Sequence, residues 1–200
     1  MPRVSAGLLL YRISDEGGLE LLIAHPGGPV WTTRDEGAWS VPKGEVEGGD
    51  DLLHTADREF AEELGMPPPP GPRLDLGEIT QRGGKHVRAW AVAGDLDATT
   101  ARSNHFEMEW PRGSGQLRSF PEIDRVAWFS ADEARRKLVE SQAVFVDRLI
   151  EALADGPGPT SRPTSPPRNR PTRSDEPPSS GGGAHGGGEQ DVGTPGIAQQ

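Results

Sequence analysis

The segment from Gly44 to Met66 constrains the fold more than any other part of the chain, because it predicts where a helix begins and ends. After Gly48-Gly49, either Asp50 or Asp51 can accept hydrogen bonds from the first-turn N–H groups and so cap a helix. Gly65 provides a left-handed stop, and the proline run that follows prevents the helix from resuming. Between these ends, apolar residues at 3-4-4 spacing predict a face that packs on a sheet: Leu53, Ala56, Phe60 and Leu64.

A second face of the same helix carries Glu59, Glu62 and Glu63, at positions i, i+3 and i+4. Their carboxylates project from adjacent turns on one side, and unneutralised carboxylates so close together repel one another at neutral pH. A hard divalent cation, which prefers oxygen ligands, relieves this repulsion. The spacing therefore predicts a site for Mg²⁺ or Mn²⁺ of the kind that supports chemistry on phosphates.

An isolated trio of acids would equally fit a solvated helix face, so the residues around it decide between the two interpretations. The whole segment resembles the signature of the Nudix hydrolase family, which is Gly, five residues, Glu, seven residues, then Arg-Glu-apolar-x-Glu-Glu-x-Gly-apolar. Asp50 stands where that signature has its first Glu, which keeps the charge and shortens the side chain by one methylene. A pattern with this many fixed positions is specific, and it favours the metal site. The positions that match are Gly44, Arg58, Glu59, Phe60, Glu62, Glu63, Gly65 and Met66.

The resemblance implies a metal-dependent enzyme that hydrolyses a pyrophosphate linkage in a nucleoside diphosphate derivative, of the NTP or dinucleoside polyphosphate type. It implies that Glu59, Glu62 and Glu63 are metal ligands, and that Glu59 also orients or deprotonates the attacking water. The carbonyl group of Gly44 often completes such a site. Arg58 is expected to hold the glutamates through an internal ion pair rather than to touch the substrate.

Three residues near the start of the signature are candidates for substrate binding. Lys43 could reach a substrate phosphate, although an exposed lysine that balances the local excess of acids fits equally well. Arg34 and Trp39, in an expected loop and a short extended piece, could contact a phosphate or stack on a base.

Members of the family often add a further acid from a long connection to the metal site. Glu107, Glu109 and Glu122 compete for that role, and each alone also fits a surface acid. We favour Glu107 and Glu109, because they fall in a stretch without predicted structure, whose tip could swing over the site.

The order of elements predicts an α/β/α sandwich around a mixed sheet in a single domain, residues 1–154. We expect the first two strands to form a hairpin, and residues 94–121 to be a long polar connection. One closing helix, opened by a capping box at Ser130, should run to about Leu153 and bury Ala134, Leu138, Phe145, Leu149 and Leu153. The expected strands cover residues 4–12, 19–24, 74–81, 86–93 and 126–129.

Composition sets further limits. Residues 155–200 are rich in Gly and Pro and have only Val192 and Ile197 as large aliphatics, so we predict a disordered tail. The net charge of −10 argues against binding to duplex nucleic acid, and the absence of cysteine excludes disulfides and thiolate metal sites. The apolar run near the N-terminus is too short to span a membrane, so we expect a cytoplasmic protein. The sequence leaves the oligomeric state open.

Two other functions fit the same scaffold. A non-catalytic Nudix-like module that senses a nucleotide could lose its metal-binding acids, whereas this chain keeps Glu59, Glu62 and Glu63. An isomerase of prenyl diphosphates usually recruits a cysteine, and the chain has none. The pyrophosphohydrolase with a nucleotide-type substrate is therefore the leading hypothesis.

Overall fold

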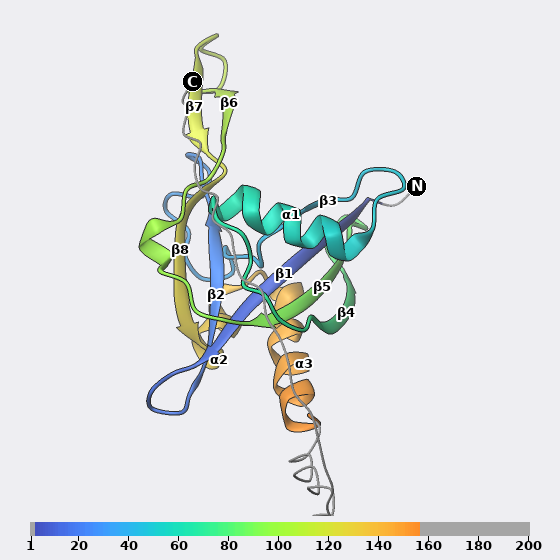
Figure 1. The fold of residues 1–200 in the computed structure, drawn as a ribbon. Helices are drawn as coiled ribbons and strands as arrows, with labels where there is room; N and C mark the ends of the chain where they lie inside the picture. The colour runs from blue at the N-terminus through green and yellow to red at the C-terminus, as the bar shows by residue number, and fades with distance from the viewer. Residues whose placement is uncertain (1–2, 157–200) are drawn as a thin grey trace, which may run out of the picture. The chain divides into compact units, whose positions relative to one another are not determined.

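The predicted β-hairpin forms the centre of the sheet in a computed structural model that describes residues 3–156 (Figure 1). β1 (Val4–Ile13) pairs antiparallel with β2 (Leu19–Pro26) and parallel with β5 (His86–Ala93), so the sheet is mixed, as predicted. β4 (Leu74–Thr80) extends the sheet beyond β5, and β8 (Ile123–Ser130) extends it beyond β2. The resulting order is β4-β5-β1-β2-β8.

Helices cover both faces of this sheet, which confirms the α/β/α sandwich (Figure 1). Side chains of a strand point alternately to the two faces, so Leu8 packs under α1 (Leu52–Leu64) while Leu9 packs under the helices of the opposite face. Those helices are α2 (Ala131–Lys137) and α3 (Ala143–Ala154). Because both faces are covered, the central strands are apolar almost without interruption.

The helix α1 begins and ends at the residues that the sequence indicates. The Asp51 side chain accepts a hydrogen bond from the His54 N–H at 2.8 Å, so Asp51 rather than Asp50 is the cap. Gly65 has φ 71°, the left-handed conformation that favours glycine at a helix end. Of the predicted face, Ala56, Phe60 and Leu64 are buried and Leu53 is only partly buried, whereas the buried Thr55 was not predicted.

The short strand β3 (Lys43–Glu45) pairs with β1 along the same edge that pairs with β2. It pairs with Ser5–Gly7, whereas β2 pairs with Leu10–Ile13 on the same edge. α1 packs on β1 and β3 together. This arrangement brings the start of the Gly44–Met66 segment under the glutamate face of the helix that follows it.

The prediction of one closing helix is wrong, because the chain forms α2, a 3₁₀ turn η2 (Glu140–Gln142) and then α3. The capping box at Ser130 is present. Leu138 and the residue after it are extended, since this stretch pairs with Trp39: the Trp39 N–H donates to the Lys137 carbonyl at 3.0 Å. Leu153 is 37% exposed, so it does not belong to the buried side.

Residues 94–121 contain more structure than the polar connection that we expected. They form a 3₁₀ turn η1 (Ala98–Thr100) and a hairpin of β6 (His105–Glu109) and β7 (Leu117–Pro121) that extends away from the sheet (Figure 1). Phe106 lies opposite Phe120, with ring centroids 6.2 Å apart. This cross-strand pair stabilises the hairpin.

Within the described part of the chain, no helix is long and apolar enough to cross a membrane. The cytoplasmic location stays a prediction. The helix α3 ends at Ala154, close to the predicted domain boundary. Most of the predicted disordered tail, from residue 157 onward, lies outside the described residues.

Candidate active site

The carboxylate of Glu59 lies directly against the backbone of β3 at Gly44. A Cβ atom at Gly44 would stand 1.8 Å from Cδ and Oε2 of Glu59, far below any normal contact. The side chain of Glu59 is only 15% exposed. Only a glycine at position 44 leaves room for this carboxylate, so the first and central parts of the signature fit one another sterically.

Glu63 lies in the same crevice and is held by β3. The Lys43 backbone N–H donates to Glu63 Oε2 at 3.1 Å. Burial raises the pKa of Glu63 to about 7; the nearby Lys43 opposes this rise, whereas the charges of Glu59 and Glu122 add to it. Burial also raises the pKa of Glu59, against the opposing charge of Arg58. Both carboxylates are therefore held in a setting that disfavours their negative charge.

Arg58 forms ion pairs with two glutamates of the helix, Glu59 and Glu62. Its Nη2 lies 2.7 Å from Glu59 Oε1 and its Nη1 lies 3.0 Å from Glu62 Oε2. The hydrogen bonds to Glu62 and the charges of both acids raise the pKa of Arg58. Glu62 is 46% exposed and faces more solvent than its two neighbours. Arg58 therefore neutralises part of the cluster from within, and its contacts lie within the helix.

Between residues 3 and 156, no three acidic or imidazole side chains converge as closely as metal ligands do. The chemistry of the donors nevertheless fits a hard divalent cation. Glu59, Glu63 and Glu122 are close enough for the charge of Glu122 to raise the pKa of both others. A divalent cation bound by these oxygens would remove that repulsion.

Of the three candidates for a further acid, the structure brings Glu122 to the helix glutamates. Glu122 joins β7 to β8, and its backbone is held on both sides: its N–H donates to the Asn104 carbonyl and its carbonyl accepts from the Gly27 N–H, each at 2.8 Å. Glu107 and Glu109 lie on β6 instead, and Glu109 accepts a hydrogen bond from Gly115 within the hairpin. The preference for Glu107 and Glu109 is thus not supported by their positions.

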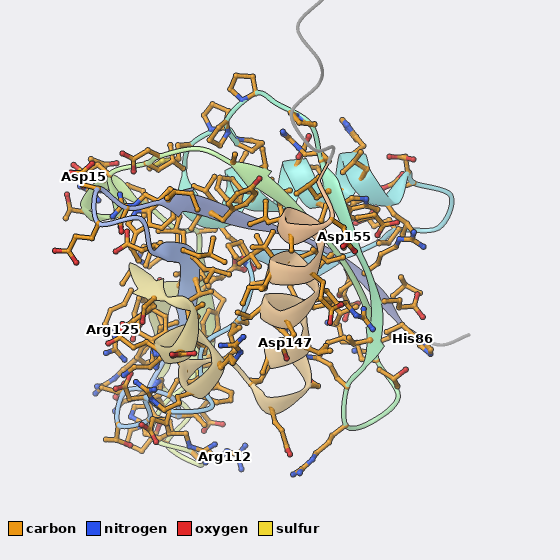
Figure 2. The ribbon with its side chains drawn as sticks, turned by 90° about the horizontal axis from the view of Figure 1, so that it is seen from below. Asp15, His86, Arg112, Arg125, Asp147 and Asp155 are labelled. Atoms are coloured by element: carbon orange, nitrogen blue, oxygen red, sulfur yellow. The ribbon has the colours of Figure 1, made fainter. Side chains whose placement is uncertain are left out.

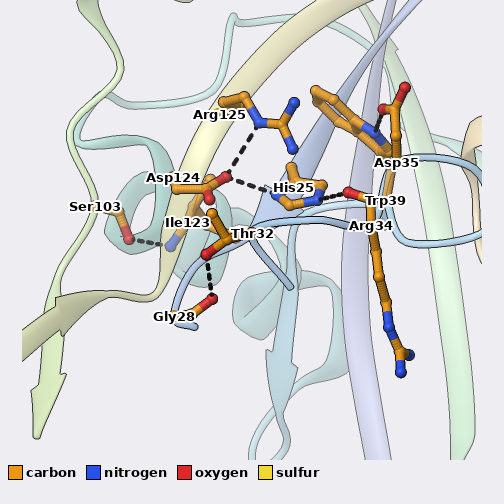
Figure 3. A network of polar contacts seen from close by, with 10 residues as sticks. All are labelled: His25, Gly28, Thr32, Arg34, Asp35, Trp39, Ser103, Ile123, Asp124 and Arg125. Carbon is orange, nitrogen blue, oxygen red and sulfur yellow. Dashed lines mark hydrogen bonds and ion pairs between the residues drawn. The ribbon is translucent and has the colours of Figure 1, made fainter. Parts of the chain in front are cut away.

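Lys43 and Arg34 have different surroundings. Lys43 is half-buried, and burial lowers the pKa of its ammonium group while the charge of Glu63 opposes this change. Arg34 is exposed, its guanidinium lies 5.3 Å from the ring centroid of Trp31, and it points away from the neighbouring polar network (Figure 3). Lys43 is therefore next to the glutamates, whereas Arg34 is not brought to them.

Trp39 is 3% exposed, so the expectation that it stacks on a base is wrong. Its Nε1–H donates to Asp35 at 2.9 Å, and its ring lies at 65° and 80° to the rings of His25 and Phe129, with centroids 5.2 and 4.9 Å apart. The guanidinium carbon of Arg125 lies 5.3 Å from its ring centroid. Trp39 is consequently part of the buried core on the face of the sheet that α2 and α3 cover.

Sequence reasoning missed a buried polar network at the edge of this region (Figure 3). His25 is fully buried; its Nδ1 lies 2.6 Å from Asp124 Oδ1, and its Nε2 donates to the Arg34 carbonyl at 2.8 Å. Asp124 and Arg125, at the start of β8, also line a cavity of about 300 Å³ whose wall includes Glu63. No motif marks these residues, because strands distant in the sequence bring them together.

The fold and the signature segment together define a protein of the Nudix class. The sequence matches the family model of the NUDIX domain over residues 1–149, so the chain belongs to the NUDIX family. This match confirms the resemblance noted from the Gly44–Met66 segment, and it supports the pyrophosphohydrolase class predicted with it. No curated protein sequence matches the chain.

Solved structures with the same fold include a binary complex of an Ap4A hydrolase from C. elegans, with a TM-score of 0.52 and 20% identity over 75% of this chain and 98% of that one. The NUDIX domain of Shewanella oneidensis NrtR, complexed with ADP ribose, has a TM-score of 0.52 and 16% identity, covering 76% and 89%. A mutT/nudix family protein from Listeria innocua has a TM-score of 0.53 and 16% identity, covering 78% and 96%. At these identities the similarity concerns the fold alone.

Proposed function

We propose that the chain is a divalent-metal-dependent pyrophosphohydrolase that acts on a nucleoside diphosphate derivative of the NTP or dinucleoside polyphosphate type. The observation that carries the proposal is the pair Glu59 and Glu63, two partly buried carboxylates that the rigid helix α1 holds against β3. Burying two like charges side by side is unfavourable unless a cation joins them. A nucleotide substrate agrees with the cytoplasmic location that we predict.

Each residue then has a distinct role. Glu59, Glu62 and Glu63 would hold Mg²⁺ or Mn²⁺, with the Gly44 carbonyl and Glu122 as further oxygen donors. When bound, the metal would neutralise phosphate oxygens and lower the pKa of a bound water. Glu59 would orient the attacking water or accept its proton, because Arg58 fixes its carboxylate from one side. 

Lys43 has an additional role in this proposal. Its backbone N–H holds Glu63, and its ammonium group lies close enough to the helix glutamates to affect the pKa of Glu63. The positive charge of this ammonium group would attract the substrate phosphate oxygens that lie near the metal ligands. Arg58 acts only through the carboxylates that it contacts.

The test measures turnover on a panel of NTPs, dinucleoside polyphosphates, sugar nucleotides, ADP-ribose and diphosphoinositols, with Mg²⁺ or Mn²⁺ and with products identified. Glu62→Gln and Glu63→Gln are expected to lower turnover by orders of magnitude while the circular dichroism spectrum is unchanged. Glu151→Gln, an exposed glutamate of α3, is the matched control and should keep full activity. Full activity of both site variants would remove these carboxylates from the reaction.

A nucleotide-sensing module without catalysis remains the alternative, and the fold shared with a NUDIX domain complexed with ADP ribose is the observation that favours it. The same panel separates the two functions. A sensor binds one of the nucleotides tightly and leaves it intact for as long as the metal is present. An enzyme releases products at a rate that depends on Glu63.

A further inference from the structure

A cavity of about 300 Å³ lies between the C-terminal end of α1, the segment that carries η1 and the start of β8. Glu63 forms part of its wall, and so do Arg102 and Asp124. It therefore opens beside a carboxylate that we assign to the metal site. Its size is at the lower end of the range for small-molecule sites.

The wall that carries Arg102 is held at three points. The Arg102 N–H donates to the Leu64 carbonyl at 2.9 Å, which fixes Arg102 to the turn of α1 that contains Glu63. The Ile123 N–H donates to Ser103 Oγ at 3.0 Å (Figure 3), and Trp128 Nε1–H donates to the Leu96 carbonyl at 3.0 Å. The segment that carries Arg102 is therefore attached to both α1 and β8, and these attachments fix its distance from Glu63.

The side chain of Asp124 already has two partners. Its Oδ1 lies 2.6 Å from Nδ1 of the fully buried His25 and 3.5 Å from Nε of Arg125 (Figure 3). The other ring nitrogen, His25 Nε2, donates to the Arg34 carbonyl at 2.8 Å, which fixes the imidazole ring. The ion pair with Arg125 offsets the negative charge of Asp124, so Asp124 does not repel an anion in the cavity as an unpaired acid would.

The guanidinium of Arg102, by contrast, meets no carboxylate among residues 3–156. Its Nη1 donates to the carbonyls of Thr99 and Ala101, at 3.2 and 2.7 Å, so these contacts fix its position but leave its charge unbalanced. Arg58 and Arg73 differ, because each donates to carboxylates at 2.7 to 3.2 Å. Arg125 also lines the cavity, but its guanidinium pairs with Asp124 at 3.5 Å and lies over Trp39.

We propose that Arg102 binds a phosphate group of the substrate in this cavity, beside the phosphoanhydride that lies at the helix glutamates. A positioned guanidinium with unused N–H donors suits phosphate oxygens, because it offers a planar fork of hydrogen bonds. Arg102 is then a substrate-binding residue that contacts a phosphate group of the diphosphate whose linkage lies at the helix glutamates. The inference rests on the proposed function for the identity of the neighbouring site.

The experiment measures binding of α,β-methylene-ADP, which is not hydrolysed between its phosphates, by isothermal titration calorimetry in the presence of Mg²⁺. Arg102→Gln should weaken binding at least about tenfold, since it removes a charged hydrogen-bond donor. Arg102→Lys should restore part of the affinity, because it returns the charge without the fork. The affinity for Mg²⁺ alone should be unchanged in both variants. Arg82→Gln is the matched control, because Arg82 is 95% exposed in the turn between β4 and β5.

The control lies far from the cavity, because β4 and β8 are at opposite edges of the sheet. Figure 2 makes the same separation visible through Arg125 on β8 and His86 at the start of β5. If Arg102 only stabilises the η1 segment, Arg102→Gln lowers the melting temperature without changing the affinity for α,β-methylene-ADP. That outcome overturns the inference, and so does a wild-type chain that binds adenosine as tightly as α,β-methylene-ADP or binds neither.

The outcomes also separate this inference from the proposed hydrolysis. Binding of α,β-methylene-ADP that depends on Arg102, in a chain that cleaves none of the panel, supports the phosphate site and contradicts the enzyme. Turnover that depends on Glu63, with an affinity that is the same in wild type and Arg102→Gln, supports the enzyme and contradicts the phosphate site. In an active enzyme we expect Arg102→Gln to raise KM more than it lowers kcat.

Discussion

Replacing Glu63 by Gln should stabilise the metal-free protein while it removes a ligand from the proposed site. Gln has nearly the size of a protonated glutamate and keeps an oxygen that can accept from the Lys43 N–H. Burial raises the pKa of Glu63 in the folded chain from the ordinary 4.5 to about 7. The folded state therefore holds this proton more tightly than the unfolded state does, and keeping Glu63 ionised lowers the free energy of unfolding.

The size and sign of the effect follow from the two pKa values. At about 1.36 kcal/mol per pH unit, the step from 4.5 to about 7 corresponds to about 3.4 kcal/mol as an upper limit. Water reaches part of the side chain, so we expect about 1 to 3 kcal/mol. Below the unfolded pKa both states are protonated, and Gln and Glu give equal stability. The advantage of Gln grows as the pH rises and is complete above the folded pKa.

Urea unfolding in the presence of EDTA, at about pH 4 and about pH 8, measures this difference. The Glu63→Gln variant should match wild type at the lower pH and exceed it at the higher pH, whereas Glu151→Gln should follow wild type at both. Adding Mg²⁺ at the higher pH should then stabilise wild type more than the variant, because only the carboxylate binds the ion well. A Glu63→Gln variant that is no more stable than wild type at about pH 8 without metal would refute the reasoning.

Further substitutions test the geometry around α1. Gly44→Ala should displace the Glu59 carboxylate, whose Cδ lies 1.8 Å from the position of the new Cβ, and lower turnover at least about tenfold with a smaller change in melting temperature. Asp51→Ala should cost about 1 kcal/mol of unfolding free energy in urea, because it removes the helix cap, whereas Asp50→Ala should cost little. A chain that ends at Gly156 should keep its melting temperature, since the helix α3 is complete at that point; a drop of several degrees would contradict this expectation.

The helix α1 and its glutamates could be predicted because their signals are local. The cap at Asp51, the apolar stripe and the left-handed Gly65 lie within one stretch of chain, and each acts on its own neighbours. The same holds for the central strands, whose apolar runs are long enough to identify them without knowing their partners. Arg58 and the glutamates at i+1 and i+4 from it meet on one helix for the same reason.

Elements that depend on distant partners could not be predicted in this way. The alternation of polar and apolar residues in β6 spans only His105–Glu109, too short to identify a strand by itself, and the pair Phe106 and Phe120 stabilises the hairpin with β7. The break between α2 and α3 occurs where Leu138 pairs with Trp39, although the sequence there has the apolar spacing of a helix. At Leu138 the contact with Trp39 overrides the local preference for helix, and in the hairpin the partner strand completes a signal that is weak locally.

The same distinction separates the residues of the candidate site. Glu122 could not be preferred over Glu107 from the sequence, because its position depends on backbone hydrogen bonds to Asn104 and Gly27. Arg102 is held beside α1 by the hydrogen bond from its N–H to the Leu64 carbonyl, and the pattern of residue types does not indicate this bond. The metal ligands that we propose therefore lie mainly on the helix, where a motif identifies them, whereas the substrate-binding residue that we propose lies on a connection that can change without disturbing the helix. Under this proposal, substrate preference depends on Arg102 and its neighbours, and the signature segment does not specify it.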